Sequence, residues 1–122
     1  MDGLVLIVDD DERNARLARD VLEASGLATL VASTAEAGIS MARERSPDVV
    51  LLDLRLPDLD GAAAMRRLSA DSRTAGIPVI AFSALPAADV REWAREAGFA
   101  DYVEKPIDVR RLPDLVRSAI RR

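Results

Sequence analysis

The sequence predicts a doubly wound α/β fold, in which a five-stranded parallel sheet is covered by helices on both faces. Apolar runs of strand length recur five times, and segments with apolar residues at helical spacing lie between them. The first, third and fourth runs are nearly uninterrupted, as in parallel strands that are buried on both faces. The expected strands are residues 4–8, 27–32, 49–52, 77–82 and 100–103.

Signals for helix ends occur in the segments between these runs. Asp11 stands where the first helix needs an N-cap, and Gly26 stands where a glycine closes that helix. Ser33 and Glu36 have the spacing of a capping box, which predicts the start of the second helix. Further helices are expected over residues 61–68, over residues 86–97 up to Gly98, and over residues 112–119.

The start of the last helix is left open by Pro113, because proline is accepted in the first turn of a helix but not deeper. If Asp108 caps this helix, Pro113 lies too far inside it. The helix therefore either starts near Leu112 or begins irregularly. Trp93 and Met41 lie on helical faces and are interpreted as packing residues.

The composition limits the chemistry that the chain can perform. Its length of 122 residues fits one compact domain, expected over residues 1–122. The absence of histidine excludes a Ser-His-Asp triad, an imidazole base and the usual zinc sites. The absence of cysteine excludes a thiol nucleophile, a disulfide framework and a CxxC redox pair.

The charge and hydropathy patterns indicate a cytoplasmic protein without direct nucleic-acid binding. Acidic residues outnumber basic residues by 21 to 17, whereas nucleic-acid binders usually present a basic face. No apolar run approaches the roughly 18 residues needed to cross a bilayer, so no membrane association is expected. The first residues also lack the basic segment of a signal peptide.

Carboxylates follow two of the expected strands at the point where each strand ends. Asp9 and Asp10 follow the first strand, and Asp53 ends the third. Parallel strands place their carboxyl ends along one edge, so these carboxylates should lie close together. Two carboxylates about 4 Å apart repel by roughly 4 kcal/mol at an effective dielectric constant of about 20. The cluster therefore predicts a hard cation such as Mg²⁺, which suggests phosphoryl chemistry. The alternative is that aspartates after strands are turn formers and caps, which is the interpretation favoured for Asp11.

A hydroxyl and an amine are expected at the same edge. Ser83 follows the fourth strand, and Lys105, the only lysine among 17 basic residues, follows the fifth. An ammonium group is a compact charge that can neutralise a phosphoryl oxygen without bidentate geometry.

Five motifs in this order resemble the receiver domains of response regulators, and the single-domain CheY and DivK types are the most similar in size. The resemblance covers residues 4–120 and implies a flavodoxin-like strand order 2-1-3-4-5, with five helices in three layers and no output domain. The motifs are Val8-Asp9-Asp10, Asp53 within residues 52–61, Ser83-Ala84, Tyr102, and Lys105-Pro106.

The resemblance also implies a role for each site residue. Asp53 would accept a phosphoryl group from a phosphohistidine on a sensor histidine kinase or a histidine phosphotransfer protein. The donor must be another molecule, since this chain has no histidine. Mg²⁺ would be bound by Asp10, Asp53 and the backbone carbonyl of Arg55, with Asp9 holding a metal-bound water. The phosphoryl oxygens would be bound by Lys105, the Ser83 hydroxyl and the Ala84 N–H.

A conformational switch is part of the same resemblance. The Ser83 hydroxyl would move toward the phosphoryl group, and the Tyr102 ring would turn inward behind it. The readout surface for an unknown downstream protein would be formed by the fourth helix, the fifth strand and the fifth helix. The Lys105-Pro106 peptide bond would be cis. The alternative for Tyr102 is a half-buried strand aromatic without a switching role.

Arg55 and Leu85 occupy places that vary among receivers and flank the route of attacking water. Our hypothesis is that Arg55 slows hydrolysis of phosphorylated Asp53; the alternative is an ordinary solvated loop residue. Two other functions remain open. One is a pseudo-receiver that binds proteins without taking phosphate, and the other is a small phosphohydrolase with an aspartyl nucleophile. Such hydrolases need a second acid two residues after the first, where this chain has Arg55.

Overall fold

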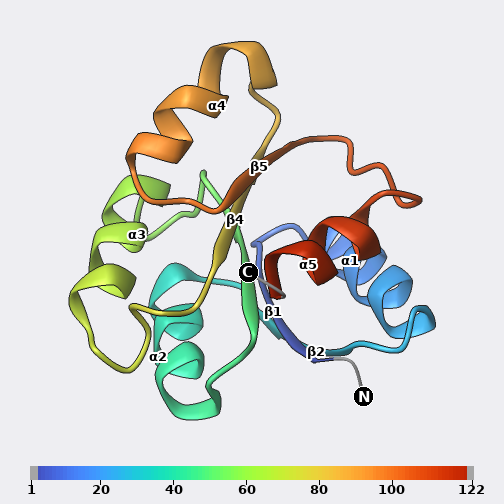
Figure 1. The fold of residues 1–122 in the computed structure, drawn as a ribbon, viewed down its shortest axis with the longest axis horizontal. Helices are drawn as coiled ribbons and strands as arrows, with labels where there is room; N and C mark the ends of the chain where they lie inside the picture. The colour runs from blue at the N-terminus through green and yellow to red at the C-terminus, as the bar shows by residue number, and fades with distance from the viewer. Residues whose placement is uncertain (1–2, 121–122) are drawn as a thin grey trace.

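A computed structural model describes residues 3–120 and shows a parallel sheet between two layers of helices (Figure 1). The strand order is β2-β1-β3-β4-β5, and each neighbouring pair of strands is parallel. Both the predicted fold class and the predicted strand order are confirmed. The strands are β1 (Leu4–Val8), β2 (Ala28–Ala32), β3 (Val49–Asp53), β4 (Val79–Ser83) and β5 (Asp101–Glu104).

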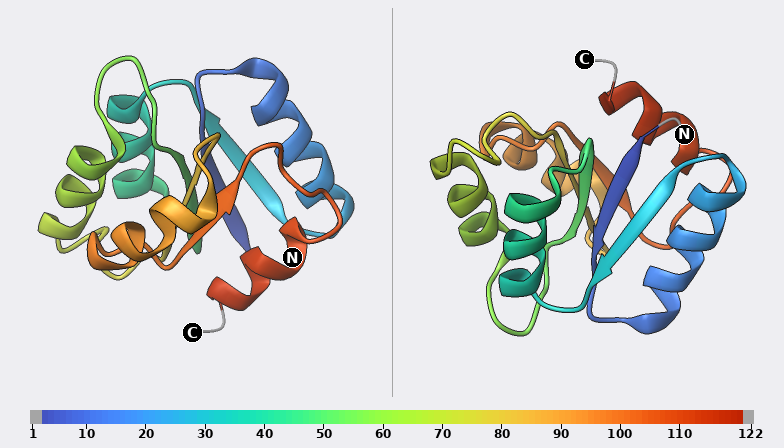
Figure 2. Two further views of the ribbon diagram at one scale, coloured as in Figure 1. Left: turned by 90° about the horizontal axis from the view of Figure 1, so that it is seen from above. Right: turned by 90° about the horizontal axis from the view of Figure 1, so that it is seen from below.

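The helices divide between the two faces of the sheet, and each face has its own hydrophobic core (Figure 2). One core lies between the sheet and α1 and α5, and the other between the sheet and α2, α3 and α4. All residues of β3 and β4 are buried, as their apolar sequences predict. The helices are α1 (Glu12–Ala24), α2 (Ala35–Arg45), α3 (Gly61–Ala70), α4 (Ala87–Glu96) and α5 (Leu112–Ile120).

Three strands begin one or two residues later than the sequence predicts: β2, β4 and β5, the last at Asp101 instead of residue 100. For β2 and β4 the reason is that the preceding backbone groups are used in turns or cannot join the ladder. The Leu27 N–H donates to the Leu22 carbonyl and closes α1, so β2 starts at Ala28. The Ile77 N–H donates to the Thr74 carbonyl, and Pro78 has no N–H, so β4 starts at Val79.

The caps of α1 agree with the prediction, whereas the cap of α2 does not. The Asp11 side chain accepts from the first-turn amides of α1, and Gly26 follows that helix with a φ of +92°. The N-cap of α2 is Thr34, whose hydroxyl accepts from the Ala37 N–H. The predicted capping box of Ser33 and Glu36 is therefore wrong: the Glu36 carboxylate is paired with Arg67 of α3 instead.

The structure shows where the last helix starts and where the two expected packing residues lie. Helix α5 starts at Leu112, so Pro113 lies in its first turn, where proline is accepted. Met41 packs against the core, as predicted. Trp93 on α4 packs its ring against Phe99, as expected of a packing residue, but it is 42% exposed and lies outside the buried core.

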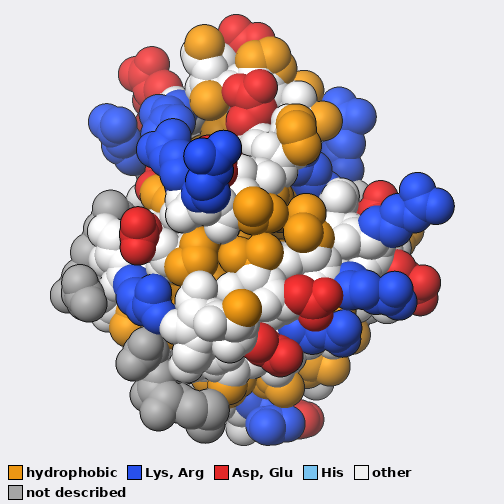
Figure 3. All heavy atoms as spheres, turned by 90° about the vertical axis from the view of Figure 1, so that its right-hand side faces the viewer, with side chains coloured by type: hydrophobic (Ala, Val, Ile, Leu, Met, Phe, Trp, Pro, Cys, Tyr) orange, Lys and Arg blue, Asp and Glu red, His pale blue; other side chains and the backbone are white. Residues whose placement is uncertain are grey.

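The surface that carries α1 and α5 mixes charges of both signs. Acidic and basic side chains surround a central group of hydrophobic side chains on this face (Figure 3). This face therefore lacks the continuous basic surface that nucleic-acid binding usually requires. No helix in the described part of the chain is long and apolar enough to cross a membrane.

Candidate functional site

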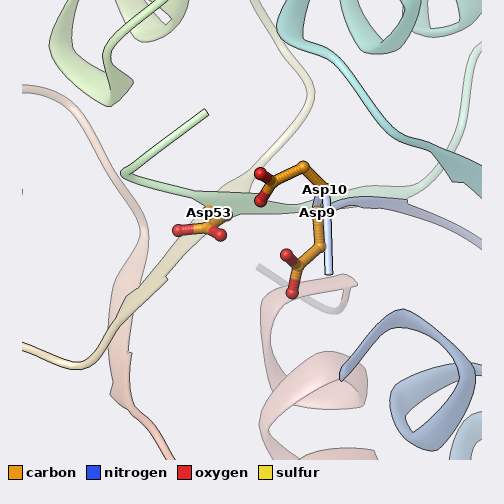
Figure 4. Close-up of side chains that lie close together, drawn as sticks. All are labelled: Asp9, Asp10 and Asp53. Carbon is orange, nitrogen blue, oxygen red and sulfur yellow. The ribbon is translucent and has the colours of Figure 1, made fainter. Parts of the chain in front are cut away.

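Three aspartates gather at the carboxyl edge of the sheet, as the sequence predicts. Asp9 and Asp10 directly follow β1, and Asp53 is the last residue of β3 (Figure 4). One carboxylate oxygen from each residue lies within 4.8 Å of the others. Because β1 and β3 are neighbouring parallel strands, their register brings these side chains together without any long loop. Asp9 and Asp53 are buried, and Asp10 is exposed.

Asp9 carries a buried carboxylate that is only partly satisfied. Its Oδ1 accepts from the Asp11 N–H at 3.0 Å, whereas its buried Oδ2 has no hydrogen-bond partner. Burial raises the pKa of Asp9 to about 6, and the neighbouring Asp53 carboxylate acts in the same direction. The Asp11 N–H and the Lys105 ammonium partly offset this rise in the pKa.

Asp53 is held on both of its oxygens. Its Oδ1 accepts from the Arg55 N–H at 3.0 Å, and its Oδ2 lies 3.1 Å from the Lys105 Nζ. The same Nζ lies 3.6 Å from the Asp9 Oδ2, so one ammonium group serves two buried carboxylates. It also lies 4.9 Å from the centre of the Phe82 ring, within the range of a cation–π contact.

This donor set fits a hard divalent cation. The three carboxylates face a single ammonium group, which leaves an excess of negative charge at the edge of the sheet. The Asp9 Oδ2 is a buried acceptor without a hydrogen bond, and such a group is costly unless it gains a partner. Oxygen ligands with space for water are the ligands that Mg²⁺ prefers. The residues present can therefore hold Mg²⁺.

Ser83 and Tyr102 lie on neighbouring strands beside the acidic cluster. Ser83 is buried at the end of β4, and its Oγ accepts from the Leu85 N–H at 3.2 Å. Tyr102 of β5 is also buried, and its hydroxyl donates to the Leu85 carbonyl oxygen. The Tyr102 ring is therefore buried in this structure, beside the segment that follows β4. Burial raises the pKa of the Tyr102 hydroxyl, which therefore stays protonated and available as a donor.

Arg55 and Leu85 lie together at one side of the site, although they are 30 residues apart in the chain. Both line a cavity of about 390 Å³ between the start of α3 and α4, whose other wall includes Val90 and Trp93. Leu85 is 37% exposed, and Ala84 beside it is also exposed. The Lys105-Pro106 peptide bond is cis.

Sequence reasoning missed contacts that span long stretches of chain. The Asp58 carboxylate accepts from the Ala35 and Glu36 N–H groups at the start of α2, and Glu104 accepts from the Ala87 N–H at the start of α4. The Phe82 ring beneath Lys105 was also not anticipated. No local spacing rule signals these partners, because each depends on how the elements pack.

The fold and the acidic edge together define a class of protein. A parallel sheet of order 2-1-3-4-5 with three aspartates, a serine and a lysine at its carboxyl edge is the arrangement expected of a receiver domain. The family model described as the response regulator receiver domain matches residues 5–117. The chain belongs to this family, which is a family of two-component signalling domains and not of conventional enzymes.

Individual relatives support the assignment. The polar-differentiation response regulator DivK of Brucella ovis is 37% identical over 114 residues, which are 93% of each chain. A putative response regulator from Chloroflexus aurantiacus is 28% identical, with a TM-score of 0.92 over 98% of both chains. The receiver domain of the sensor histidine kinase PA1611 from Pseudomonas aeruginosa is 27% identical, with a TM-score of 0.86 over 98% of both chains. That structure is described with a magnesium ion coordinated in its active-site cleft.

Proposed function

We propose that this chain is a Mg²⁺-dependent phosphoacceptor and that Asp53 is the residue that takes the phosphoryl group. The observation that carries this proposal is the environment of Asp53: a buried carboxylate at the end of β3, 3.1 Å from Lys105 Nζ and adjacent to Asp9 and Asp10. A buried charge at the end of an apolar strand has little structural purpose. It does have a chemical one if a phosphoryl group is transferred to it.

The transfer needs one bond to form and one to break. A carboxylate oxygen of Asp53 forms a bond to phosphorus while the P–N bond of a phosphohistidine breaks, and the electron pair of that bond returns to the imidazole nitrogen. The phosphohistidine would belong to a sensor histidine kinase or a histidine phosphotransfer protein, because residues 1–122 contain no histidine. Positioning and charge neutralisation do most of the catalytic work in such a transfer.

The residues around Asp53 divide this work. Asp10, Asp53 and the Arg55 carbonyl would bind Mg²⁺, and Asp9 would hold a metal-bound water. When bound, Mg²⁺ neutralises oxygens of the incoming phosphoryl group. Lys105 would bind and orient the same group, because its ammonium already lies 3.1 Å from the Asp53 Oδ2 and 3.6 Å from the Asp9 Oδ2. The Ser83 hydroxyl and the Ala84 N–H complete the set of donors.

The response of the protein is proposed to reach partners through α4, β5 and α5. A cavity of about 370 Å³ lies on this face, lined by residues of all three elements, Tyr102 and Glu104 among them. Tyr102 contacts the segment after β4 through its hydroxyl, so a movement of Ser83 changes the surroundings of that contact. Residues 1–122 would act as one receiver domain, and this face would bind the downstream protein.

Intact-mass measurement tests the proposal directly. The protein is incubated with acetyl phosphate in the presence and absence of Mg²⁺, and the mass of one phosphoryl adduct is expected only with Mg²⁺. The Asp53→Asn variant should gain no adduct, whereas Asp114→Asn, the same change at an exposed position on α5, should gain it normally. If the parent protein gains no adduct, the chain is a pseudo-receiver that binds partners without phosphorylation. Sustained multiple turnover of acetyl phosphate, with rapid hydrolysis of the adduct, would instead indicate a phosphohydrolase.

The lifetime of the phosphorylated form is proposed to depend on Arg55. This side chain lies two residues after Asp53 and lines the same cavity as Leu85. A long cation there can shield the phosphoryl group from water. Loss of the adduct, followed by intact mass after removal of acetyl phosphate, should be faster in Arg55→Ala than in the parent. Equal or slower loss would contradict the proposal, and Arg66→Ala, an exposed change on α3, is the control.

A further inference from the structure

Helix α4 lacks a cap of its own. The side chains of Asp11, Thr34 and Asp60 cap α1, α2 and α3 from the residue just before each helix. At the corresponding position of α4 stands Pro86, which makes no side-chain hydrogen bond to the helix. An uncapped helix start leaves backbone N–H groups without partners, and it also leaves the positive end of the helix dipole uncompensated.

Glu104 of β5 supplies the missing acceptor. Its Oε1 accepts from the Ala87 N–H, the first amide of α4, at 2.9 Å, although the two residues are 17 positions apart. The sheet register brings them together, because Glu104 lies opposite Ser83 in the β4–β5 pair and α4 begins shortly after Ser83. A carboxylate at this place compensates both the free amide and the dipole.

Besides the hydrogen bond between Glu104 and Ala87, two further contacts in the described part of the chain connect β5 to α4 or to the residues just before it. The Tyr102 hydroxyl donates to the Leu85 carbonyl just before the helix, and Asp101 is 3.5 Å from Arg91 in the second turn. Glu104 directly precedes Lys105 in the chain. The Lys105 N–H donates to the Ser83 carbonyl oxygen at 2.7 Å, and the Lys105 Nζ contacts Asp53. The cap of α4 thus sits next to a residue of the phosphoacceptor site.

We propose that Glu104 is a positioning residue, whose carboxylate caps α4 and holds the Ser83–Ala87 segment in the arrangement seen here. Releasing α4 for a partner then requires the hydrogen bond between Glu104 and Ala87 to break. The proposed link between phosphorylation and the readout surface rests on the proposed function. The proposed capping of α4 by Glu104 is independent of it.

Trp93 makes the position of α4 measurable, because it is the only tryptophan of the chain and lies on this helix, 42% exposed. In Glu104→Ala, hydrogen exchange of the first-turn amides of α4 should become about fivefold faster, the factor that corresponds to loss of an ordinary helix cap. Quenching of Trp93 fluorescence by acrylamide should increase together with exchange. Glu104→Gln keeps an oxygen acceptor and should retain most of the protection. Glu44→Ala removes the same charge at an exposed position of α2 and should change neither signal.

A second variant tests the same hydrogen bond from its donor side. Ala87→Pro removes the N–H at the first helical position, where proline is accepted, and Pro86 already has the extended conformation that a following proline requires. In an Ala87→Pro background only the interaction of the Glu104 charge with the helix dipole is left, so Glu104→Ala should have a much smaller effect on both signals. A full-sized effect there, or unchanged exchange and quenching in Glu104→Ala alone, would overturn the proposal.

These measurements are made without phosphate or Mg²⁺, so they judge the cap even if the chain is never phosphorylated. Addition of acetyl phosphate and Mg²⁺ then tests the link to the proposed function. The Trp93 signal of the parent should change as the adduct forms, and the change should be smaller in Glu104→Ala, whose α4 is already released. An adduct that forms with an equal Trp93 change in both proteins would contradict the link. Absence of any adduct would contradict the proposed function. The capping role of Glu104 would then be judged by hydrogen exchange and Trp93 quenching alone.

Discussion

Two aspartates at the acidic edge share the ammonium group of Lys105. The Lys105 ammonium lies 3.1 Å from the Asp53 Oδ2 and 3.6 Å from the Asp9 Oδ2, and its side chain is 17% exposed. Because Asp10 adds a third carboxylate, the charges of the cluster are not balanced by the described side chains around it. Asp9 bears the largest consequence, since its Oδ2 is buried without a hydrogen bond.

Asp9→Asn should therefore stabilise the metal-free protein at neutral pH. The pKa of Asp9 is raised from 3.8 to about 6, so its ionised form is less favourable in the folded than in the unfolded chain. This destabilising contribution is absent below about pH 4, grows as the pH rises, and is complete above about pH 6. We expect Asp9→Asn to increase the free energy of unfolding at pH 7 by about 1–3 kcal/mol.

Urea unfolding in EDTA at pH 7 and pH 4 measures this effect. The gain should shrink toward zero at pH 4, where Asp9 is protonated in both states of the parent. A gain of the same size at both pH values would mean that packing, and not charge, is responsible. Mg²⁺ should narrow the difference at pH 7 by stabilising the parent more than the variant.

At the scale of elements, helix ends are held by side chains from other parts of the chain. The two Asp58 oxygens accept from the Ala35 and Glu36 N–H groups at 2.9 and 3.0 Å and so tie the loop after β3 to the start of α2. Since Asp53 ends β3, this loop follows the proposed phosphoacceptor directly. The loop is also fixed by the bridge between Arg55 and Asp60.

Replacing Asp58 should destabilise the protein in a pH-dependent manner. The hydrogen bonds from Glu36 and Ala35 hold the pKa of Asp58 below its usual value of 3.8. A carboxyl group with a lowered pKa contributes stability that is fully present above pH 3.8 and is lost as the pH falls through the lowered value. Asp58→Ala should thus lower the urea midpoint at pH 7 and pH 5, and the difference should diminish toward pH 3. Asp114→Ala, on the exposed side of α5, is expected to show no such pattern.

The start of α3 leaves no space for a side chain at Gly61. A Cβ added at Gly61 would lie 2.4 Å from the Leu54 Cδ2 and 2.9 Å from the Leu54 Cα, and a backbone atom cannot move aside cheaply. The steric clash in Gly61→Ala should lower the free energy of unfolding by about 1–3 kcal/mol. This loss should exceed the roughly 1 kcal/mol by which alanine stabilises a helix relative to glycine. Gly76→Ala is the matched control, because no atom lies within 4 Å of its added Cβ. A neutral or stabilising effect at Gly61 in thermal unfolding would contradict this account.

Much of the fold and of the candidate site follows from local pattern. The cap of α1 by Asp11 involves amides two and three residues away, so its spacing is visible in the sequence. The acidic cluster was predictable as well, because parallel topology alone brings strand ends together. The caps supplied by Asp58 and Glu104 were not, since the partners lie 22 to 23 and 17 residues away and meet only through packing.

Trp93 shows the other limit of sequence reasoning. Its place on a helical face predicted a packing residue, but not how much of the side chain would stay exposed. In the structure Val90 and Ala94 form the buried side of α4, and the Trp93 side chain is exposed beside Phe99. The spacing of hydrophobic residues predicted the helix correctly. How many of its residues are buried depends on the elements that pack against it.

For the whole molecule, the acidic edge is a strained feature supported by the rest of the fold. Two hydrophobic cores, one on each face of the sheet, hold β1 and β3 in register and keep Asp9 and Asp53 together despite their charges. The free energy of those cores is what offsets the repulsion at the edge. A ligand that removes the repulsion should consequently stabilise the entire domain.

Mg²⁺ should raise the thermal midpoint of the whole domain. A ligand that binds the folded state alone stabilises it by about 1.4 kcal/mol at ten times its dissociation constant, which for a domain of this size corresponds to roughly 3–6 °C. Differential scanning calorimetry across a MgCl₂ series, against NaCl of equal ionic strength, separates binding from general screening. Asp10→Asn should abolish most of the shift without disturbing a core, because Asp10 is exposed and belongs to the cluster. Asp114→Asn should keep the full shift, and an equal response of both variants would place the cation elsewhere.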